Sequence, residues 1–317
     1  MKKRFSVFLA GVLALSALIF AACDSNDSSS GPKDENFYDG TPITKVINGT
    51  LNDALKEAKG KVYWKIRGEF SVVSGNVEDS SILGAEEIEE IILEGDEDYG
   101  AELRGTGNGG VGVIKANSGA TLIIKNMIVS DSSSPWRDTW EADALEFGGK
   151  LRFENCTFSD RILLKHDAEA EFVNCSFYSP DEKRYAVWVL DGSASFKNCS
   201  FTGRRGLKIH EESSFNADVG SVIVENCTFS DIAEKPGLSI GTIAIDPENT
   251  TVKFKDCTFT GCQDWDDAAG GSREGIDGFY ETDTLTETFR FIVENTTIDG
   301  VDASTLTKEF NQHPVEE

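Results

Sequence analysis

A four-residue segment that recurs along the chain constrains the fold more than any other feature. It reads Asn or Asp, Cys, Thr or Ser, and Phe, and its five copies begin at Asn155, Asn174, Asn198, Asn226 and Asp256. Two degenerate copies begin at Asn126 and Asn295, and successive copies start 19 to 39 residues apart. A period of this size is typical of a solenoid whose coils carry loops of different length. The sequence therefore predicts a stack of coils.

The residues before each copy alternate between apolar and polar. The positions two and four residues before the Asn or Asp are apolar in every copy, and the positions between them carry charges such as Arg152 and Glu154. This alternation predicts a strand with one buried face. Asn suits the corner that follows, because it tolerates a left-handed backbone and its amide can bond to the Asn of the next coil. We expect a second strand after each corner, with its Cys and Phe pointing inward.

Coils that stack at about 4.8 Å, the spacing of neighbouring strands, should build columns of identical side chains inside the solenoid. The phenylalanine column would comprise Phe158, Phe177, Phe201, Phe229 and Phe259. The cysteine column would comprise Cys156, Cys175, Cys199, Cys227 and Cys257. We expect these cysteines to be small buried residues with free thiols. Disulfides between adjacent coils are the alternative, because six cysteines follow Cys23 and neighbouring backbones lie within bonding range. No CxxC or paired-histidine pattern supports zinc.

The N-terminus resembles a lipoprotein export signal. Lys2, Lys3 and Arg4 precede an apolar run that is too short and wrongly flanked for a membrane span. The run ends in Phe20-Ala21-Ala22-Cys23, which resembles the lipobox of bacterial lipoproteins. Cys23 is therefore the expected lipid anchor, since two or more acyl chains attach a protein stably. An ordinary signal peptide with an accidental cysteine is the alternative.

Three regions are expected along the chain. A signal peptide would span 1–22, a disordered tether rich in Ser, Asp, Asn and Gly would span 23–41, and one β-helix domain would span 42–317. The expected location is the bacterial cell envelope, at the outer membrane or the cell surface. The inner membrane is the alternative, because Asp24 follows the cysteine.

The charge of the chain restricts its partners. The formal net charge is −25, and removal of the three basic residues of the signal gives −28. So acidic a chain is a poor partner for nucleic acid and for anionic lipid, and we expect a monomer that meets the membrane only through its lipid. Residues 150–210 differ, because ten Lys or Arg stand there against eight Asp or Glu. We therefore expect an anionic ligand to bind at that stretch.

The segments ahead of the repeats complete the pattern. Thr50-Leu51-Asn52-Asp53 resembles a capping box that opens a short amphipathic helix over the end of the first coil, and residues 62–70, 91–93 and 111–114 have the pattern of early coils. Together with the repeats, over about residues 43–301, the chain resembles the pectate-lyase-like superfamily. The resemblance implies an all-β, single-stranded right-handed parallel β-helix. It implies no single activity, because the superfamily includes lyases, hydrolases, methylesterases and adhesins.

A third strand in each coil should carry the candidate site on its outward face, where the enzymes of that superfamily keep their chemistry. We expect these strands at residues 144–147, 162–166, 186–190, 206–210 and 242–246. If their apolar positions point inward, the side chains that point outward together are those of Glu146, Lys165, Lys208 and His210, whereas His166 would turn inward. Lys165, Lys208 and His210 are the candidate catalytic residues, because in a lyase such a group takes the proton beside a uronate carboxylate.

Long loops should wall this face. Those at 130–141, 230–241 and 260–278 are long, whereas the loops after Phe158 and Phe201 are short. The predicted substrate-binding residues combine indole rings with arginine and carboxylate, as sugar-binding clefts do, and they are Trp136, Arg137, Trp140, Glu146, Arg161, Arg204, Arg205 and Trp265. Asp264, Asp266 and Asp267 are candidate ligands for Ca²⁺, although their spacing is not that of a regular calcium loop. Solvated charges and loop-anchoring tryptophans are the alternative.

Two functions remain open from the sequence. The first is a lipid-anchored β-helix that binds an acidic polysaccharide and, in the stronger form, cleaves it as a lyase. The second is a non-enzymatic adhesin or scaffold that presents loops. The sequence lacks the basic motif of the commonest pectate lyases, the paired aspartates of polygalacturonases and the signature segments of pectin methylesterases. No catalytic residue can therefore be transferred from these enzymes, and the question of enzymatic activity stays open.

Overall fold

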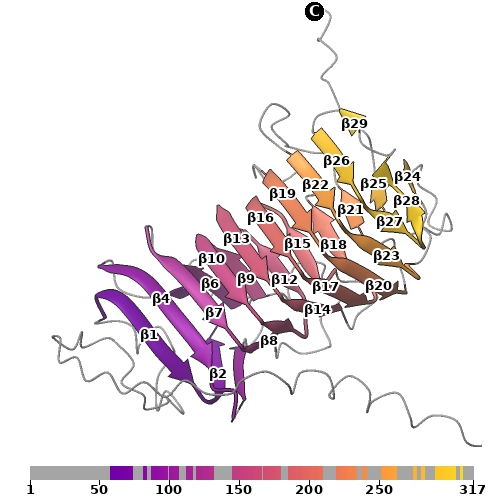
Figure 1. Ribbon diagram of the computed structural model, residues 1–317. Helices are drawn as coiled ribbons and strands as arrows, with labels where there is room; N and C mark the ends of the chain where they lie inside the picture. Colours follow the sequence, from indigo (N-terminus) through magenta and orange to yellow (C-terminus); the bar gives the residue numbers. More distant parts are fainter. Residues whose placement is uncertain are drawn as a thin grey trace, which may run out of the picture. The chain divides into compact units, whose positions relative to one another are not determined.

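A computed structural model shows a β-solenoid built from three sheets (Figure 1). The structure describes residues 58–73, 81–83, 87–98, 100–106, 112–116, 119–131, 145–165, 167–179, 185–209, 219–233, 238–240, 251–262, 274–276, 280–282, 290–304 and 308–309. The expected signal peptide, the lipid anchor Cys23, the tether and most of the expected capping helix lie outside these residues. Within the part that is described, no helix is long and apolar enough to cross a membrane.

Sheet A collects the strand that precedes the Asn corner in each coil. Its order is β1 (Gly60–Ile66), β4 (Ile88–Gly95), β7 (Thr121–Lys125), β10 (Lys150–Glu154), β13 (Ala168–Val173), β16 (Gly192–Lys197), β19 (Val219–Glu225), β22 (Thr251–Lys255), β26 (Arg290–Glu294) and β29 (Lys308–Glu309). The neighbours pair in parallel from β1 to β26, and these strands run side by side in Figure 1. Only β29 pairs antiparallel. The predicted alternation is confirmed, because Leu151 and Phe153 are buried while Arg152 and Glu154 are partly exposed.

Sheet B collects the strand that follows the corner. Its order is β2 (Gly68–Val73), β5 (Ala101–Thr106), β8 (Ile128–Asp131), β11 (Thr157–Phe158), β14 (Ser176–Ser179), β17 (Ser200–Gly203), β20 (Thr228–Ile232), β23 (Thr258–Thr260), β27 (Thr297–Ile298) and β28 (Val301–Asp302). Residues 62–70, which we expected to belong to an early coil, form parts of β1 and β2, which are separated at Arg67.

Sheet C collects the third strands. Its order is β24 (Glu274–Ile276), β25 (Tyr280–Thr282), β21 (Leu238–Ile240), β18 (Leu207–Ile209), β15 (Val187–Val189), β12 (Ile162–Leu164), β9 (Leu145–Gly148), β6 (Gly112–Ala116) and β3 (Ser81–Leu83). One predicted strand was wrong: the partner of β18 is Leu238–Ile240, not residues 242–246. Both segments read apolar-x-apolar, and so short a pattern does not by itself decide which of them continues the sheet.

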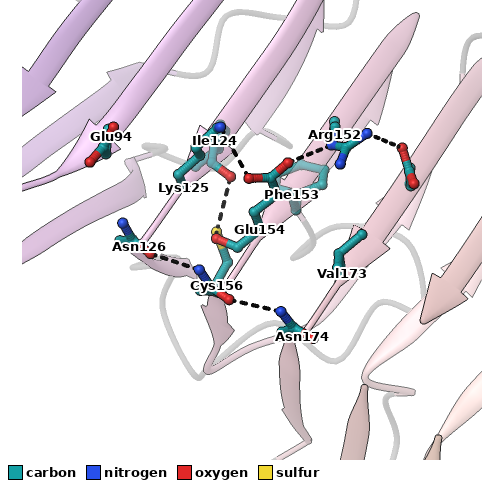
Figure 2. A network of polar contacts seen from close by, with 12 residues as sticks. Glu94, Ile124, Lys125, Asn126, Arg152, Phe153, Glu154, Cys156, Val173 and Asn174 are labelled. Atoms are coloured by element: carbon teal, nitrogen blue, oxygen red, sulfur yellow. Dashed lines mark hydrogen bonds and ion pairs between the residues drawn. The ribbon is translucent and has the colours of Figure 1, made fainter. Parts of the chain in front are cut away.

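The corner between sheets A and B repeats in every coil from Asn126 onward. All seven corner residues have positive φ, from 46° at Asn295 to 56° at Asn198. Five corner amides donate a hydrogen bond to the corner residue of the preceding coil, and Figure 2 shows this ladder between Asn126 and Asn174. The Nδ2–Oδ1 distances are 3.0 Å from Asn155 to Asn126, 3.2 Å from Asn174 to Asn155, 3.0 Å from Asn198 to Asn174 and 2.7 Å from Asn226 to Asn198. The sequence-based prediction of an asparagine ladder is confirmed.

Two phenylalanine columns fill the interior. The predicted column from Phe158 to Phe259 is buried throughout, and its successive ring centroids lie 4.3 to 4.8 Å apart. A second column from sheet A, formed by Phe153, Phe172 and Phe196, stacks in the same way. Rings of the two columns meet edge to face, a geometry that aromatic quadrupoles favour. The burial of these rings and the contacts between them both stabilise the stack of coils.

Candidate functional site

The outward face of sheet C places several of the predicted residues in one row. Glu146 of β9 pairs in register with Leu163 of β12, Leu163 with Trp188 of β15, and Trp188 with Lys208 of β18. These positions share a face because alternate residues of a strand point the same way. The predicted outward positions of Glu146 and Lys208 are thus the observed ones. The row also contains Trp188, which the sequence analysis did not select.

This face is covered, in contrast to the open cleft floor that we expected. Lys208 is 6% exposed and Arg161 is 4% exposed, and Leu163, Trp188 and Leu190 form a small apolar cluster separate from the main core. All three residues of β12, of β15 and of β18 are buried, although an outward residue of an open sheet face would be exposed. The middle strands of sheet C therefore have two buried faces.

Cations and aromatic rings alternate at the outward face of sheet C. The guanidinium carbon of Arg161 lies 4.9 Å from the centroid of Trp188, and Lys208 Nζ lies 4.5 Å from the same ring. Lys208 Nζ also lies 5.3 Å from the centroid of Tyr185. Arg205 continues the series, with its guanidinium carbon 5.3 Å from Tyr185. We call these five residues the cation–aromatic row. Each contact attracts a cation to the negative face of a ring, and burial strengthens that attraction.

Two hydrogen-bond donors in the row are buried without a partner. The indole Nε1 of Trp188 and the guanidinium Nε of Arg205 have almost no exposed surface and no acceptor in the described structure. A buried donor that lacks an acceptor costs about 1–3 kcal/mol. These two donors are therefore suited to a ligand that brings oxygen acceptors.

Lys165 and Glu146 form an ion pair at one end of this face. Lys165 Nζ lies 3.0 Å from Glu146 Oε1, with the Glu146 side chain 8% exposed. This ion pair joins Lys165, a predicted catalytic residue, to Glu146, a predicted substrate-binding residue. The Lys165 amino group is thus engaged by the carboxylate of the neighbouring coil.

The remaining predicted residues divide into two groups. Arg204 lies on the short connection between β17 and β18 and is exposed, and Arg205 next to it is half-buried. The others lie outside the described residues, and they are His210, Trp136, Arg137, Trp140, Trp265, Asp264, Asp266 and Asp267. The proposed Ca²⁺ ligands are among these. In the residues that the structure describes, no group of three or more His, Cys, Asp or Glu could hold a metal ion.

Trp188 and Tyr185 were missed by the sequence analysis, although a signal for Trp188 was present. Val187 and Val189 flank Trp188, and placing both inward turns the indole outward by strand alternation. Tyr185 precedes strand β15, and strand alternation does not predict where a side chain outside a strand points. Its place beside Lys208 depends on how the coils stack.

A concave surface lies on sheet A. It has a volume of ≈ 600 Å³, and its lining includes hydroxyl groups on β7, β16 and β19 together with paired charges on β10 and β13. The hydroxyl residues are Thr121, Ser193, Ser195 and Ser221. None of the predicted site residues lines this groove. Arg152, which lines this groove, can therefore serve as a control position for experiments on sheet C.

The chain belongs to a known family. The model of the right handed beta helix region matches residues 111–310, which is more than half of the chain. Two solved structures of the pectin methylesterase from Aspergillus niger are similar to the chain over 90% of its length and 92% of theirs, at 12% sequence identity. Their TM-scores are 0.51 for the penultimately deglycosylated form and 0.50 for the deglycosylated form. No curated protein sequence matches the chain. At this identity the likeness shows a shared fold, the right-handed parallel β-helix.

Proposed function

We propose that the protein binds an acidic polysaccharide along the outward face of sheet C. The single observation that carries this proposal is the cation–aromatic row, in which three cations alternate with two rings on a chain of net charge −25. Sugar rings stack on aromatic faces, and uronate carboxylates bond to guanidinium and ammonium groups. The structurally similar enzyme is named as acting on pectin, which fits a ligand of this class.

The row supports binding better than cleavage. A general base must reach the proton of the substrate, whereas the amino group of Lys165 is paired with Glu146 and that of Lys208 lies against two aromatic faces. His210, the third candidate base of the sequence analysis, lies outside the described residues. Lyase activity therefore stays a separate part of the proposal. Unsaturated uronate products absorb in the near ultraviolet, so incubation with polygalacturonate or alginate tests it directly.

The binding test compares two arginines on different faces. Arg205→Ala should lower affinity for polygalacturonate about tenfold, since a hydrogen bond to a charged group contributes about 1.5–3 kcal/mol. The loss should shrink at high salt, because exposed Coulombic contacts are screened. Arg152→Ala on sheet A is the matched control and should bind as the parent does. Equal losses from both variants, or a parent that binds no polyuronate in calorimetry, would refute the proposal.

A non-enzymatic scaffold is the second candidate function. The observation that favours it is the burial of Lys208 and Arg161, whose charged groups are accessible to a ligand only if the cover of sheet C opens. In that case the cation–aromatic row would stabilise the coil stack instead of binding a glycan. Unchanged binding in both arginine variants, together with a loss of stability in Arg205→Ala, would favour this function.

The proposal includes anchoring in the bacterial cell envelope through acylated Cys23. The support is the lipobox-like Phe20-Ala21-Ala22-Cys23 after a basic and apolar start. In bacterial cells, Cys23→Ser should move the protein from the membrane fraction to the soluble fraction. Mass spectrometry of the parent should find the lipid on Cys23, and recovery of an unmodified parent chain in the soluble fraction would contradict the anchor.

A further inference from the structure

The outward face of sheet A carries a row of alternating charges. The row consists of the residue directly before each Asn or Asp corner, together with the residues in register with it on β4 and β1. In chain order its members are Lys65, Glu94, Lys125, Glu154, Val173, Lys197, Glu225, Lys255 and Glu294. We call these residues the charge row. Figure 2 shows its part from Glu94 to Val173 on neighbouring strands.

The charges alternate on both sides of Val173, but the alternation shifts phase there. After Glu154, strict alternation would place a cation at position 173 and an anion at position 197, whereas the chain has Val173 and Lys197. Pairing between neighbouring coils needs alternation alone, so the shift adds nothing to contacts within one chain. It does make the row antisymmetric. Read backwards from its last residue, the row has the opposite sign at every charged position.

Ion pairing within the charge row is confined to its first half. Lys65 Nζ lies 3.8 Å from Glu94 Oε1, and Lys125 Nζ lies 3.1 Å from Glu154 Oε2. The charged members of the row that form no ion pair with any described residue are Lys197, Glu225 and Lys255. These three charges are available to a second molecule.

The groove on sheet A has a shape that complements its own reverse. Its lining is centred on β13. On one side β10 contributes the long side chains of Lys150 and Arg152, and on the other side β16 contributes the short side chains of Ser193 and Ser195. In a second copy turned about β13, the long side chains of each copy would lie over the serines of the other.

We propose that two copies of this chain dimerise through the outward faces of sheet A. Their solenoids run antiparallel about a two-fold axis that lies between the two faces and parallel to β13. Each position then faces the position equally far on the other side of β13, so Glu154 faces Lys197 of the second copy. A slip by one coil would set like charges against one another along the row, which fixes the register. This dimer replaces the monomer that we expected from the sequence.

Acidic residues lie on the proposed axis. Glu169 and Glu171 would each face the same residue of the second copy. Both are paired with cations of the preceding coil, because Glu171 Oε2 lies 2.9 Å from Arg152 Nη1 and Glu169 Oε2 lies 3.7 Å from Lys150 Nζ. These cations offset the repulsion between the carboxylates at the axis.

The size of the face suits a weak dimer. The strands from β1 to β26, at about 4.8 Å each and about five residues long, present about 600 Å² per copy. The total of about 1,200 Å² is at the lower end of specific interfaces, so we expect a dissociation constant of about 10–100 μM. Ile123 against Ile223 of the second copy adds an apolar contact. The like charges at the positions of Lys61 and Arg290 face one another at the outer ends, where solvent and salt screen them.

Sedimentation of the full-length Cys23→Ser protein tests the proposal. The parent should change from monomer to dimer as its concentration rises, and high salt should reverse the change, because the contacts are Coulombic. Lys197→Glu sets a carboxylate against Glu154 at two symmetric contacts and should weaken dimerisation about tenfold. Glu154→Lys sets an ammonium group against Lys197 and should weaken it similarly.

A mixture of these two variants provides the sharpest test. In the mixed dimer, Glu154 of one copy faces Lys197 of the other, and the two exchanged charges also face one another. The mixture should therefore dimerise as tightly as the parent, although each variant alone does not. A loss of folding cannot cause this result, since mixing does not refold a chain. Arg104→Glu reverses a charge on sheet B and is the matched control, which should dimerise as the parent does.

Cross-linking locates the two-fold axis. Packed sheet faces are about 10 Å apart, so Val173→Cys, which lies on the axis, should react with the same residue of the second copy through a short bismaleimide. Tyr178→Cys, at an exposed position on sheet B, should not. The described cysteines are buried free thiols, as we expected for those of the repeat, and should not react.

Four results would overturn the proposal: a parent that stays monomeric at its highest soluble concentration, a mixture no tighter than its separate variants, an equal loss in Arg104→Glu, or no cross-link at Val173→Cys. A monomeric parent whose affinity for polygalacturonate falls in Lys197→Glu would assign this face to a glycan instead. Glycan binding on sheet C is measured with Arg205→Ala, so either proposal can fail without the other.

Discussion

The corner between sheets A and B and the outward face of sheet C are built by opposite rules. At the corner, nearly the same residue recurs in every coil, with φ confined to 46°–56° and an amide bonded to its neighbour below. On sheet C, the register row changes from Glu146 to Leu163, Trp188 and Lys208. Repetition suits a fold, because identical units stack alike. A row of different side chains suits recognition, which requires a particular pattern of charge and shape.

The largest effect is expected from the repeated interior. Phe201→Ala should lower the free energy of unfolding by about 3–5 kcal/mol, because it opens a cavity in the middle of a ring column. Urea unfolding followed by circular dichroism measures the change. Tyr178→Ala, at a side chain that is 50% exposed, is the control and should change stability by less than about 0.5 kcal/mol. Similar losses in the two variants would show that the columns do not dominate stability.

A smaller loss is expected at the corner. Asn198→Ala should cost about 2–3 kcal/mol, because it removes two ladder hydrogen bonds and places a Cβ residue without a polar side chain at φ 56°. Asn198→Gly keeps the backbone conformation and should cost about half as much. Thermal unfolding of both variants separates the amide from the backbone contribution. If Gly and Ala are equally destabilising, the left-handed conformation costs little here.

Sheet C should respond in function more than in stability. Lys208→Met replaces a buried cation by an apolar side chain of similar length, and stability should stay within about 1 kcal/mol of the parent. Affinity for polygalacturonate should fall, since the central cation of the cation–aromatic row is lost. Calorimetry and thermal unfolding on the same sample measure both effects. A stability loss without a change in binding would assign Lys208 to the scaffold.

The smallest effect, a gain, is expected at the one corner occupied by aspartate. Asp256 accepts a hydrogen bond from Asn295 at 3.1 Å, but no hydrogen bond joins Asp256 to Asn226 among the described ladder residues. An ionised carboxylate has no proton to donate to the Asn226 oxygen. Asp256→Asn should restore that contact and add about 0.5–1.5 kcal/mol. Asn155→Asp is the reverse control, and a ladder unaffected by either change would contradict this reasoning.

The sequence predicted the interior in detail and the site in part. The Phe and Cys columns and the Asn corners follow from short patterns whose period matches a strand or a turn. The third strand of the coil that contains β21 was placed four residues too late, because an apolar-x-apolar triplet occurs twice there. Glu146 and Lys208 were correctly placed outward by alternation alone. The pairing of Lys165 with Glu146 was not foreseen, since it joins two coils.

By itself the sequence determined what repeats: three strands per coil, inward rings and thiols, and asparagine at a left-handed corner. These features are local, because strand alternation and the backbone preference of Asn act within a few residues. Only the tertiary structure decided which outward side chains meet. Arg161, Trp188 and Lys208 belong to successive coils joined by connections of different length, and their contacts depend on the register in which the coils stack. The burial of this face was likewise decided by the tertiary structure, since burial depends on everything that packs over it.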